Sequence, residues 1–240
     1  MKKRIWELDV LRGICLIGIM YFHLMYDLVY LFGVVELTTP LARALYQFGN
    51  DWGGTPFLII SGVCVTLGAR CVKRGLEVIG GGLVISAVTV GMYLLDFADR
   101  SIIIYFGVLH CIGTCMLLWS LFKKVPVPVL LVLGILLSAL GLYWKYTDLR
   151  IDSHLLTLLG IPSWKFASSD YFPLLPNFGF FLLGACAGKT FYRDRVSLLP
   201  RVNPENFLVR FFSFFGKHSL IFYLLHQPVL AALVSLWLML

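Results

Sequence analysis

Residues 7–28 read ELDVLRGICLIGIMYFHLMYDL, and this stretch decides the fold class. The apolar run to which it belongs covers residues 10–33, long enough to cross a bilayer, because a spanning helix needs roughly 17–25 residues. A basic start before an apolar run is also typical of a signal peptide. This run is too long for one, however, and it holds Arg12, His23 and Asp27. We therefore expect it to remain in the protein as a first transmembrane helix.

The composition of the whole chain extends this interpretation. Its 240 residues are 59% hydrophobic and only 14% charged, whereas a soluble domain carries about 25% charged residues. The mean hydropathy of +0.86 indicates that lipid is the solvent of much of the surface. Further apolar runs are found at 54–69, 75–95, 102–122, 126–144, 171–191 and 219–240. The sequence predicts an all-α, polytopic membrane protein of about seven transmembrane helices, with residues 1–240 forming a single domain.

The distribution of Lys and Arg between these runs predicts the orientation. Fourteen lie at the N-terminus and in the even-numbered loops, against five in the odd-numbered loops. Since cytoplasmic loops carry the excess of basic residues, we expect a cytoplasmic N-terminus and a C-terminus outside. The same sidedness explains the net charge of +7, so that we expect no nucleic-acid partner.

The six cysteines lie mostly inside apolar runs and form no CxxC pair. A cysteine in a membrane helix is usually a small apolar filler. We therefore expect neither a disulfide framework nor a metal site.

The ionisable residues of the first run are candidate site residues, because each costs about 2.5–3.5 kcal/mol inside a membrane on insertion scales. Asp9 and Arg12 are three residues apart, so they share a helix face and either form an ion pair that anchors the helix end or serve a ligand. His23 and Asp27 are four apart in the outer half of the bilayer. A carboxylate beside an imidazole suits a general base, although such a pair can also simply hold helices together.

Other candidates lie in the later runs. His110 is expected at a depth similar to that of His23, where the two could line one cavity, although for His110 taken alone we favour a packed or structural role. His226 precedes Pro228, and we favour a structural role in which His226 or Gln227 satisfies a backbone carbonyl freed by the proline. The sequences NDWGGTPF (50–57) and DYFPLLPN (170–177) break the helical pattern on the outer side. There we expect Asp51, Asp170 and Asn177 to contact a substrate.

Three connecting regions predict further helical structure. Residues 34–53 and 145–170 mix apolar, aromatic and acidic side chains, and we expect them to fold against the outer helix ends. Residues 207–215 place aromatic side chains beside Arg210 and Lys217, which is typical of a segment at the membrane interface.

An ordered set of motifs resembles the bacterial heparan-alpha-glucosaminide N-acetyltransferase-like family over nearly the whole chain. The motifs are ELDVLRG, IMYFHLMYDL, FLIISG, FGVLHCIG, DYFPLLPNFGFFLLG and GKHSLIFYLLHQP. Separately, the spacing of Asp9, Arg12 and His23 resembles the first helix of the acyltransferase-three family. In lysosomal members of the first family the active histidine lies in the first lumenal loop, but residues 34–53 contain none. The resemblance therefore assigns that role to His23.

The resemblance implies a transmembrane acyltransferase of the bacterial inner membrane. Cytosolic acyl-CoA, most simply acetyl-CoA, would be the donor and a glycan or similar molecule outside the acceptor. His23, Asp27 and His110 would then be catalytic, and Arg12 and Asp9 would lie at the donor. Two other readings stay open: a proton-coupled small-molecule transporter that uses the same groups as a relay, and a channel-like or accessory protein. The sequence leaves open the acyl chain length and whether the chain forms a homodimer.

Overall fold

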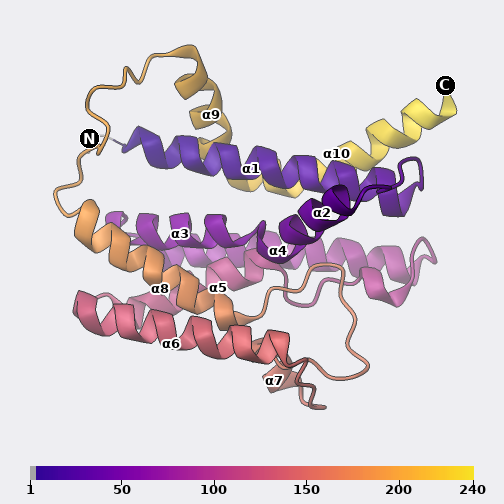
Figure 1. The fold of residues 1–240 in the computed structure, drawn as a ribbon, viewed down its shortest axis with the longest axis horizontal. Helices are drawn as coiled ribbons and strands as arrows, with labels where there is room; N and C mark the ends of the chain where they lie inside the picture. The colour runs from indigo at the N-terminus through magenta and orange to yellow at the C-terminus, as the bar shows by residue number, and fades with distance from the viewer. Residues whose placement is uncertain (1–3) are drawn as a thin grey trace. The chain divides into compact units, whose positions relative to one another are not determined.

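The computed structural model describes residues 4–240, and within that range it contains helices and no strand (Figure 1). The helices are α1 (Trp6–Tyr26), which continues as a π-helix (Asp27–Leu31), α2 (Pro40–Trp52), α3 (Thr55–Leu67), α4 (Cys71–Leu94), α5 (Val108–Phe122), α6 (Val127–Tyr146), α7 (His154–Leu159), α8 (Leu174–Phe191), α9 (Phe207–Lys217) and α10 (Ser219–Met239). A 3-10 turn at Arg100–Ile102 precedes α5. The prediction of an all-α protein is confirmed, and the regions 34–53 and 145–170 contain the helices α2 and α7.

Five helices of the described part of the chain are long and apolar enough to cross a membrane. They are α1 with its π-helical continuation, α4, α6, α8 and α10. Large apolar side chains stand exposed on them, as Leu94 and Trp237 do, and lipid rather than water is the environment that such side chains require. The chain is therefore a multi-pass membrane protein. The count of seven spans stays a prediction, because α3 has 13 residues and α5 has 15, fewer than a spanning helix needs. The orientation also stays a prediction.

The late start of α5 corrects the run predicted at 102–122. The backbone of Ile104 is extended toward α4, where its N–H donates to Thr89 Oγ1 at 3.1 Å and its carbonyl accepts from Ser86 Oγ at 2.6 Å. Helical geometry begins only after Gly107, the residue before α5. Hydropathy counts residues 102–107 as part of a span, but within this stretch side chains of α4 bind the backbone of Ile104.

The helices gather into two compact units. One unit comprises the chain up to Phe57 together with Val196–Leu240, and the other comprises Leu58–Arg195. In the first unit, α1 is the central element and is contacted by α2, α9 and α10. In the second unit, α4 packs on α5 and α6 packs on α8.

Small residues set the distance between helices in the second unit. Gly134, Ser138 and Gly141 form a seam on α6 that faces α8, where a Cβ added at Gly179 would overlap Ser138. A Cβ added at Gly62 of α3 would overlap the carbonyl oxygen of Phe181 in α8. Because the hydrophobic effect does not drive helices together in lipid, close approach of backbones at small residues is a main source of their affinity.

We predict that Gly62→Ala destabilises the protein by about 1–3 kcal/mol, because the added methyl group forces α3 away from α8. Intrinsic helix propensity alone would favour alanine by about 1 kcal/mol. Gly80→Ala is the matched control, since nothing lies within 4 Å of the Cβ position at Gly80 in α4. Thermal unfolding in detergent should show a loss for the first variant and none for the second. Equal stability of the two variants would show that the close contact has no energetic role.

Candidate functional site

The candidate site of the first unit begins where α1 changes its helical form. The α-helix runs to Tyr26, and Asp27–Leu31 form a π-helix in which the Phe32 N–H donates to the Asp27 carbonyl at 2.8 Å. Single π-helical turns inside longer helices occur frequently at functional sites. The change of form falls one turn after His23, directly at Asp27.

Asp27 is fully buried and is bound by a residue of α10. Its Oδ1 accepts a hydrogen bond from Gln227 Nε2 at 2.7 Å. Its Oδ2 is buried without a hydrogen-bond donor among the described residues, and so is Gln227 Oε1. Both of these atoms accept hydrogen bonds, so the Asp27–Gln227 pair can bind a further group that donates them.

His23 lies against a second residue of α10. Its ring is 4.8 Å from that of His226 between centroids, at an interplanar angle of 67°. The Nδ1 of His226 lies 2.6 Å from the carbonyl oxygen of Tyr223. Because a carbonyl can only accept, Nδ1 carries a proton, and Nε2 of the neutral ring is an acceptor. That Nε2 is buried and has no partner within the described residues.

These contacts revise the predicted pairing of His23 with Asp27. The two side chains do share a helix face, as the spacing of four residues predicted, and that face contacts α10. The partners, however, differ from the expectation, because Asp27 is bound by Gln227 while His23 packs on His226. From the sequence, both His226 and Gln227 were expected only to satisfy the backbone carbonyl freed by Pro228, and neither was placed at the site. The available signal was a pair of adjacent polar residues, His226 and Gln227, inside the apolar run of α10.

His110 belongs to the second unit, and its contacts are those of a structural residue. Its Nδ1 accepts from the Gly107 N–H at 3.3 Å at the start of α5, and its Nε2 lies 3.5 Å from Ser86 Oγ. The ring also packs closely on α4, since a Cβ at Gly82 would meet it at 2.9 Å. Both nitrogens therefore have partners in the fold, in contrast to the free Nε2 of His226.

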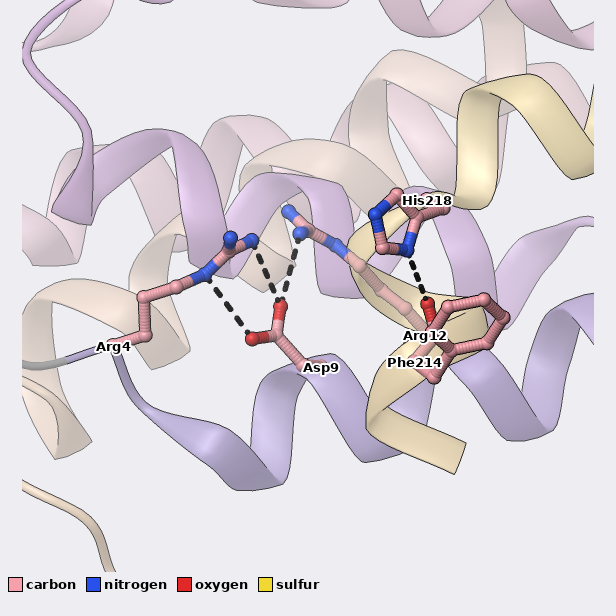
Figure 2. A network of polar contacts seen from close by, with 5 residues as sticks. All are labelled: Arg4, Asp9, Arg12, Phe214 and His218. Carbon is pink, nitrogen blue, oxygen red and sulfur yellow. Dashed lines mark hydrogen bonds and ion pairs between the residues drawn. The ribbon is translucent and has the colours of Figure 1, made fainter. Parts of the chain in front are cut away.

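A cluster of charges surrounds Asp9 at the start of α1, as Figure 2 shows. Arg4 Nε lies 3.2 Å from Asp9 Oδ2, and Arg12 Nη1 lies 3.7 Å from Asp9 Oδ1. Asp9 and Arg12 are paired, as predicted, and Arg4 is a second cation that the sequence analysis did not single out. Glu7 was also missed: it is buried, and its Oε1 accepts from the Leu198 N–H at 2.8 Å. Two cations therefore face the single carboxylate of Asp9 at this end of α1.

The three residues predicted to contact a substrate all have partners in the protein. Asp51 lies on α2 and accepts from Gln47 at 3.0 Å. Asn177 is buried near the start of α8 and donates to the Pro173 carbonyl at 2.8 Å. Asp170 accepts from the Val108 N–H at 3.0 Å and so caps α5. Asp51 belongs to the first unit, and Asp170 and Asn177 belong to the second.

The described residues hold no group of three His, Cys, Asp or Glu side chains placed to bind a metal ion. What these elements do define is a class: an all-α, multi-pass membrane protein that buries a cluster of imidazole, carboxylate and amide groups between two spanning helices. Residues 4–228 match the family model of the heparan-alpha-glucosaminide N-acetyltransferase catalytic domain. The chain belongs to this family, which confirms the resemblance seen in its motifs. No curated protein and no solved structure is significantly similar to the chain.

We predict a pH-dependent contribution of Asp170 to stability. Burial raises the pKa of Asp170 to about 6, although the bond from Val108 acts in the opposite direction. A raised carboxyl pKa means that the folded state binds more protons than the unfolded state between about pH 4 and 6, so the free energy of unfolding falls as the pH rises through that window.

Asp170→Asn removes this ionisation and keeps an oxygen that can accept from Val108. Above pH 6 the variant should be more stable than the wild type by at most about 3 kcal/mol, and below pH 4 the difference should vanish. Chemical unfolding in detergent from pH 4 to 7 measures it, with Asp152→Asn as a control for the loss of an exposed carboxylate. Parallel pH profiles for wild type and Asp170→Asn would contradict the assignment.

Proposed function

We propose that this chain transfers an acetyl group from acetyl-CoA in the cytosol to a glycan or similar acceptor outside, across the bacterial inner membrane. The observation that carries the proposal is the cluster of His23, His226, Asp27 and Gln227 between α1 and α10 in a member of an N-acetyltransferase family. The excess of basic residues on one side supports the orientation, with the N-terminus in the cytosol.

The molecule that receives the acetyl group would bind where α1 and α10 leave hydrogen-bond acceptor atoms unpaired. His226 Nε2, Asp27 Oδ2 and Gln227 Oε1 are all buried lone-pair groups. An amine or hydroxyl group supplies the donors that such atoms need, and leaving them unpaired costs free energy. The cluster therefore suits a molecule that donates hydrogen bonds and then gives up a proton.

The reaction forms a bond between the acceptor nitrogen or oxygen and the acetyl carbon, and it breaks the thioester bond. In direct transfer, an imidazole of the pair removes the proton of the attacking acceptor. In a covalent route, His23 first carries the acetyl group, and His226 Nε2 takes the proton when the acceptor attacks. In either route the CoA sulfur leaves as a thiolate and receives a proton. Acetylation of His23 when the enzyme is mixed with the donor alone would identify the covalent route by mass spectrometry.

Asp27 would act on this pair from one helical turn away. A buried carboxylate favours the protonated form of a nearby imidazole, which develops as the base takes its proton. Gln227 holds the carboxylate through Oδ1, so the orientation of Asp27 depends on α10 as much as on α1. Asp27 is thus proposed as a positioning residue.

The donor would be held at the start of α1. Its phosphates are negatively charged, and Arg12 is the cation of the Asp9 cluster that lies one turn further into the helix. The Arg12 side chain is still 21% exposed, whereas that of Asp9 is 5% exposed. Arg12 can therefore offer part of its guanidinium to a phosphate while the rest remains paired with Asp9.

We predict that His23→Ala lowers kcat about 10²–10⁴-fold while donor binding changes little, because general-base catalysis is worth about that much. His226→Ala should lower kcat within the same range. If the two imidazoles work as one unit, the kcat of the double variant will be only slightly below that of the less active single variant. Asp27→Asn should lose less than either. Transfer of radiolabelled acetyl groups by the purified, full-length protein measures all four.

The control for this experiment is His110→Ala, a histidine of the second unit. It should lower thermal stability, because it removes the acceptor of the Gly107 N–H at the start of α5, and leave the turnover of folded protein unchanged. Loss of transfer in His110→Ala together with normal turnover in folded His23→Ala would move the catalytic assignment to α5. Proton-coupled uptake by the wild type without any acetyl transfer would favour a transporter instead.

A second prediction concerns the donor. Arg12→Ala should raise the KM for acetyl-CoA about tenfold, because it removes a charge-assisted bond to phosphate worth about 1.5 kcal/mol. Asp9→Asn is the informative comparison, since it breaks the same ion pair but leaves the cation free. Its KM should stay equal or fall. If both variants raise KM alike, Arg12 serves only to anchor the end of α1.

A further inference from the structure

The helix α9 is held against the start of α1 at backbone distance. A Cβ added at Gly13 would overlap the carbonyl oxygen of Phe212, and one added at Gly216 would overlap that of Asp9. Ser213 and Gly216 are the buried residues of α9, so its small-residue face is the one turned to α1. Since α1 is a spanning helix, this contact fixes α9 at the membrane end of α1.

The remaining surface of α9 is aromatic and uncovered. Phe207 is 76% exposed, and Leu208, Phe211 and Phe214 are exposed as well. The rings stack on one another along the helix, with centroids 6.2 Å apart for Phe207 and Phe211. A helix that presents such a face beside a spanning helix is expected to bury it in the boundary between headgroups and acyl chains.

Two cations border this aromatic face. Arg210 and Lys217 are seven residues apart, so they lie on one side of the helix. Together with the rings of Phe207, Phe211 and Phe214 they line a groove of about 850 Å³. The groove also holds Glu205, whose Oε2 is 4.0 Å from Arg210 Nη1, and His218, whose Nδ1 lies 2.9 Å from the Phe214 carbonyl oxygen. Its formal charge is therefore positive, with one carboxylate opposing two cations.

From this arrangement we infer that the α9 groove binds an anionic phospholipid, with the phosphate at Arg210 and Lys217 and an acyl chain over the exposed phenylalanines. Positive charge beside an apolar, lipid-facing surface complements a molecule that joins a negative headgroup to apolar chains. The site is separate from the polar cluster of α1 and α10, and the inference does not depend on acetyl transfer. It extends the predicted interfacial role of residues 207–215 to a lipid of defined charge.

The test is retention of dioleoylphosphatidylglycerol and dioleoylphosphatidylcholine by the full-length protein in detergent, measured by native mass spectrometry. The wild type should prefer the anionic lipid. Arg210→Gln/Lys217→Gln should weaken its binding about 25-fold, because each basic residue at an anionic surface is worth about fivefold. Lys123→Gln/Lys124→Gln, which makes the same charge change at exposed positions after α5, should retain most of the preference.

Three further arms extend the test: a variant expected to gain binding, a variant that removes the aromatic surface, and competition by a soluble phosphate. Glu205→Gln removes the opposing carboxylate and should strengthen binding of the anionic lipid, a gain that a damaged protein would not show. Phe211→Ser/Phe214→Ser should weaken both lipids. Equal retention of the two lipids by the wild type, or equal losses in the two double charge variants, would overturn the inference. So would competition by glycerol 3-phosphate as strong as that by the intact lipid, which would identify a site for a soluble phosphate.

Discussion

A carboxylate buried in a membrane-spanning helix has no water to bind, so it must find a hydrogen-bond donor within the protein. Asp27 finds one in Gln227, 200 residues further along the chain. This bond joins the first spanning helix to the last, and the same pairing of α1 with α10 brings the rings of His23 and His226 together. An apolar residue at position 27 would remove the hydrogen bond that favours this register of α1 against α10. The arrangement of the candidate site therefore depends on the Asp27–Gln227 hydrogen bond, because lipid offers Asp27 no other donor.

Much of the fold could be predicted from the sequence, because lipid imposes a simple rule. A segment that crosses it must be apolar and must satisfy its own backbone, so each long apolar run was expected to be a helix, and each contains one. The rule fails where other parts of the protein satisfy the backbone. Residues 102–107 are apolar but not α-helical, because Ser86 and Thr89 of α4 bind the backbone of Ile104. Hydropathy cannot register a hydroxyl group on a neighbouring helix.

The candidate site was predictable to a smaller extent, for a related reason. The shared face of His23 and Asp27 is a local property of one helix and follows from the helical repeat. Their partners are not local: His226 and Gln227 approach them only after two distant segments have packed. His110 shows the same limit, since its place in an apolar run could not reveal that its two nitrogens contact Gly107 and Ser86. A polar residue inside a span indicates a position with a polar partner, but the sequence does not identify that partner.

The π-helical turn at Asp27–Leu31 forms the end of the first spanning helix, so a change within it acts on the residues that follow. Such a turn closes its hydrogen bonds over five residues instead of four, so deleting one residue from it would restore a continuous α-helix. Everything before the deletion, including His23, would keep its place. Everything after it would rotate by about 100° around the axis. Tyr30, whose ring lies 5.2 Å from that of Tyr46 on α2, would then point elsewhere. The loop and helix that follow could thus be re-aimed in a relative of this chain, while the residues before Asp27 kept their positions.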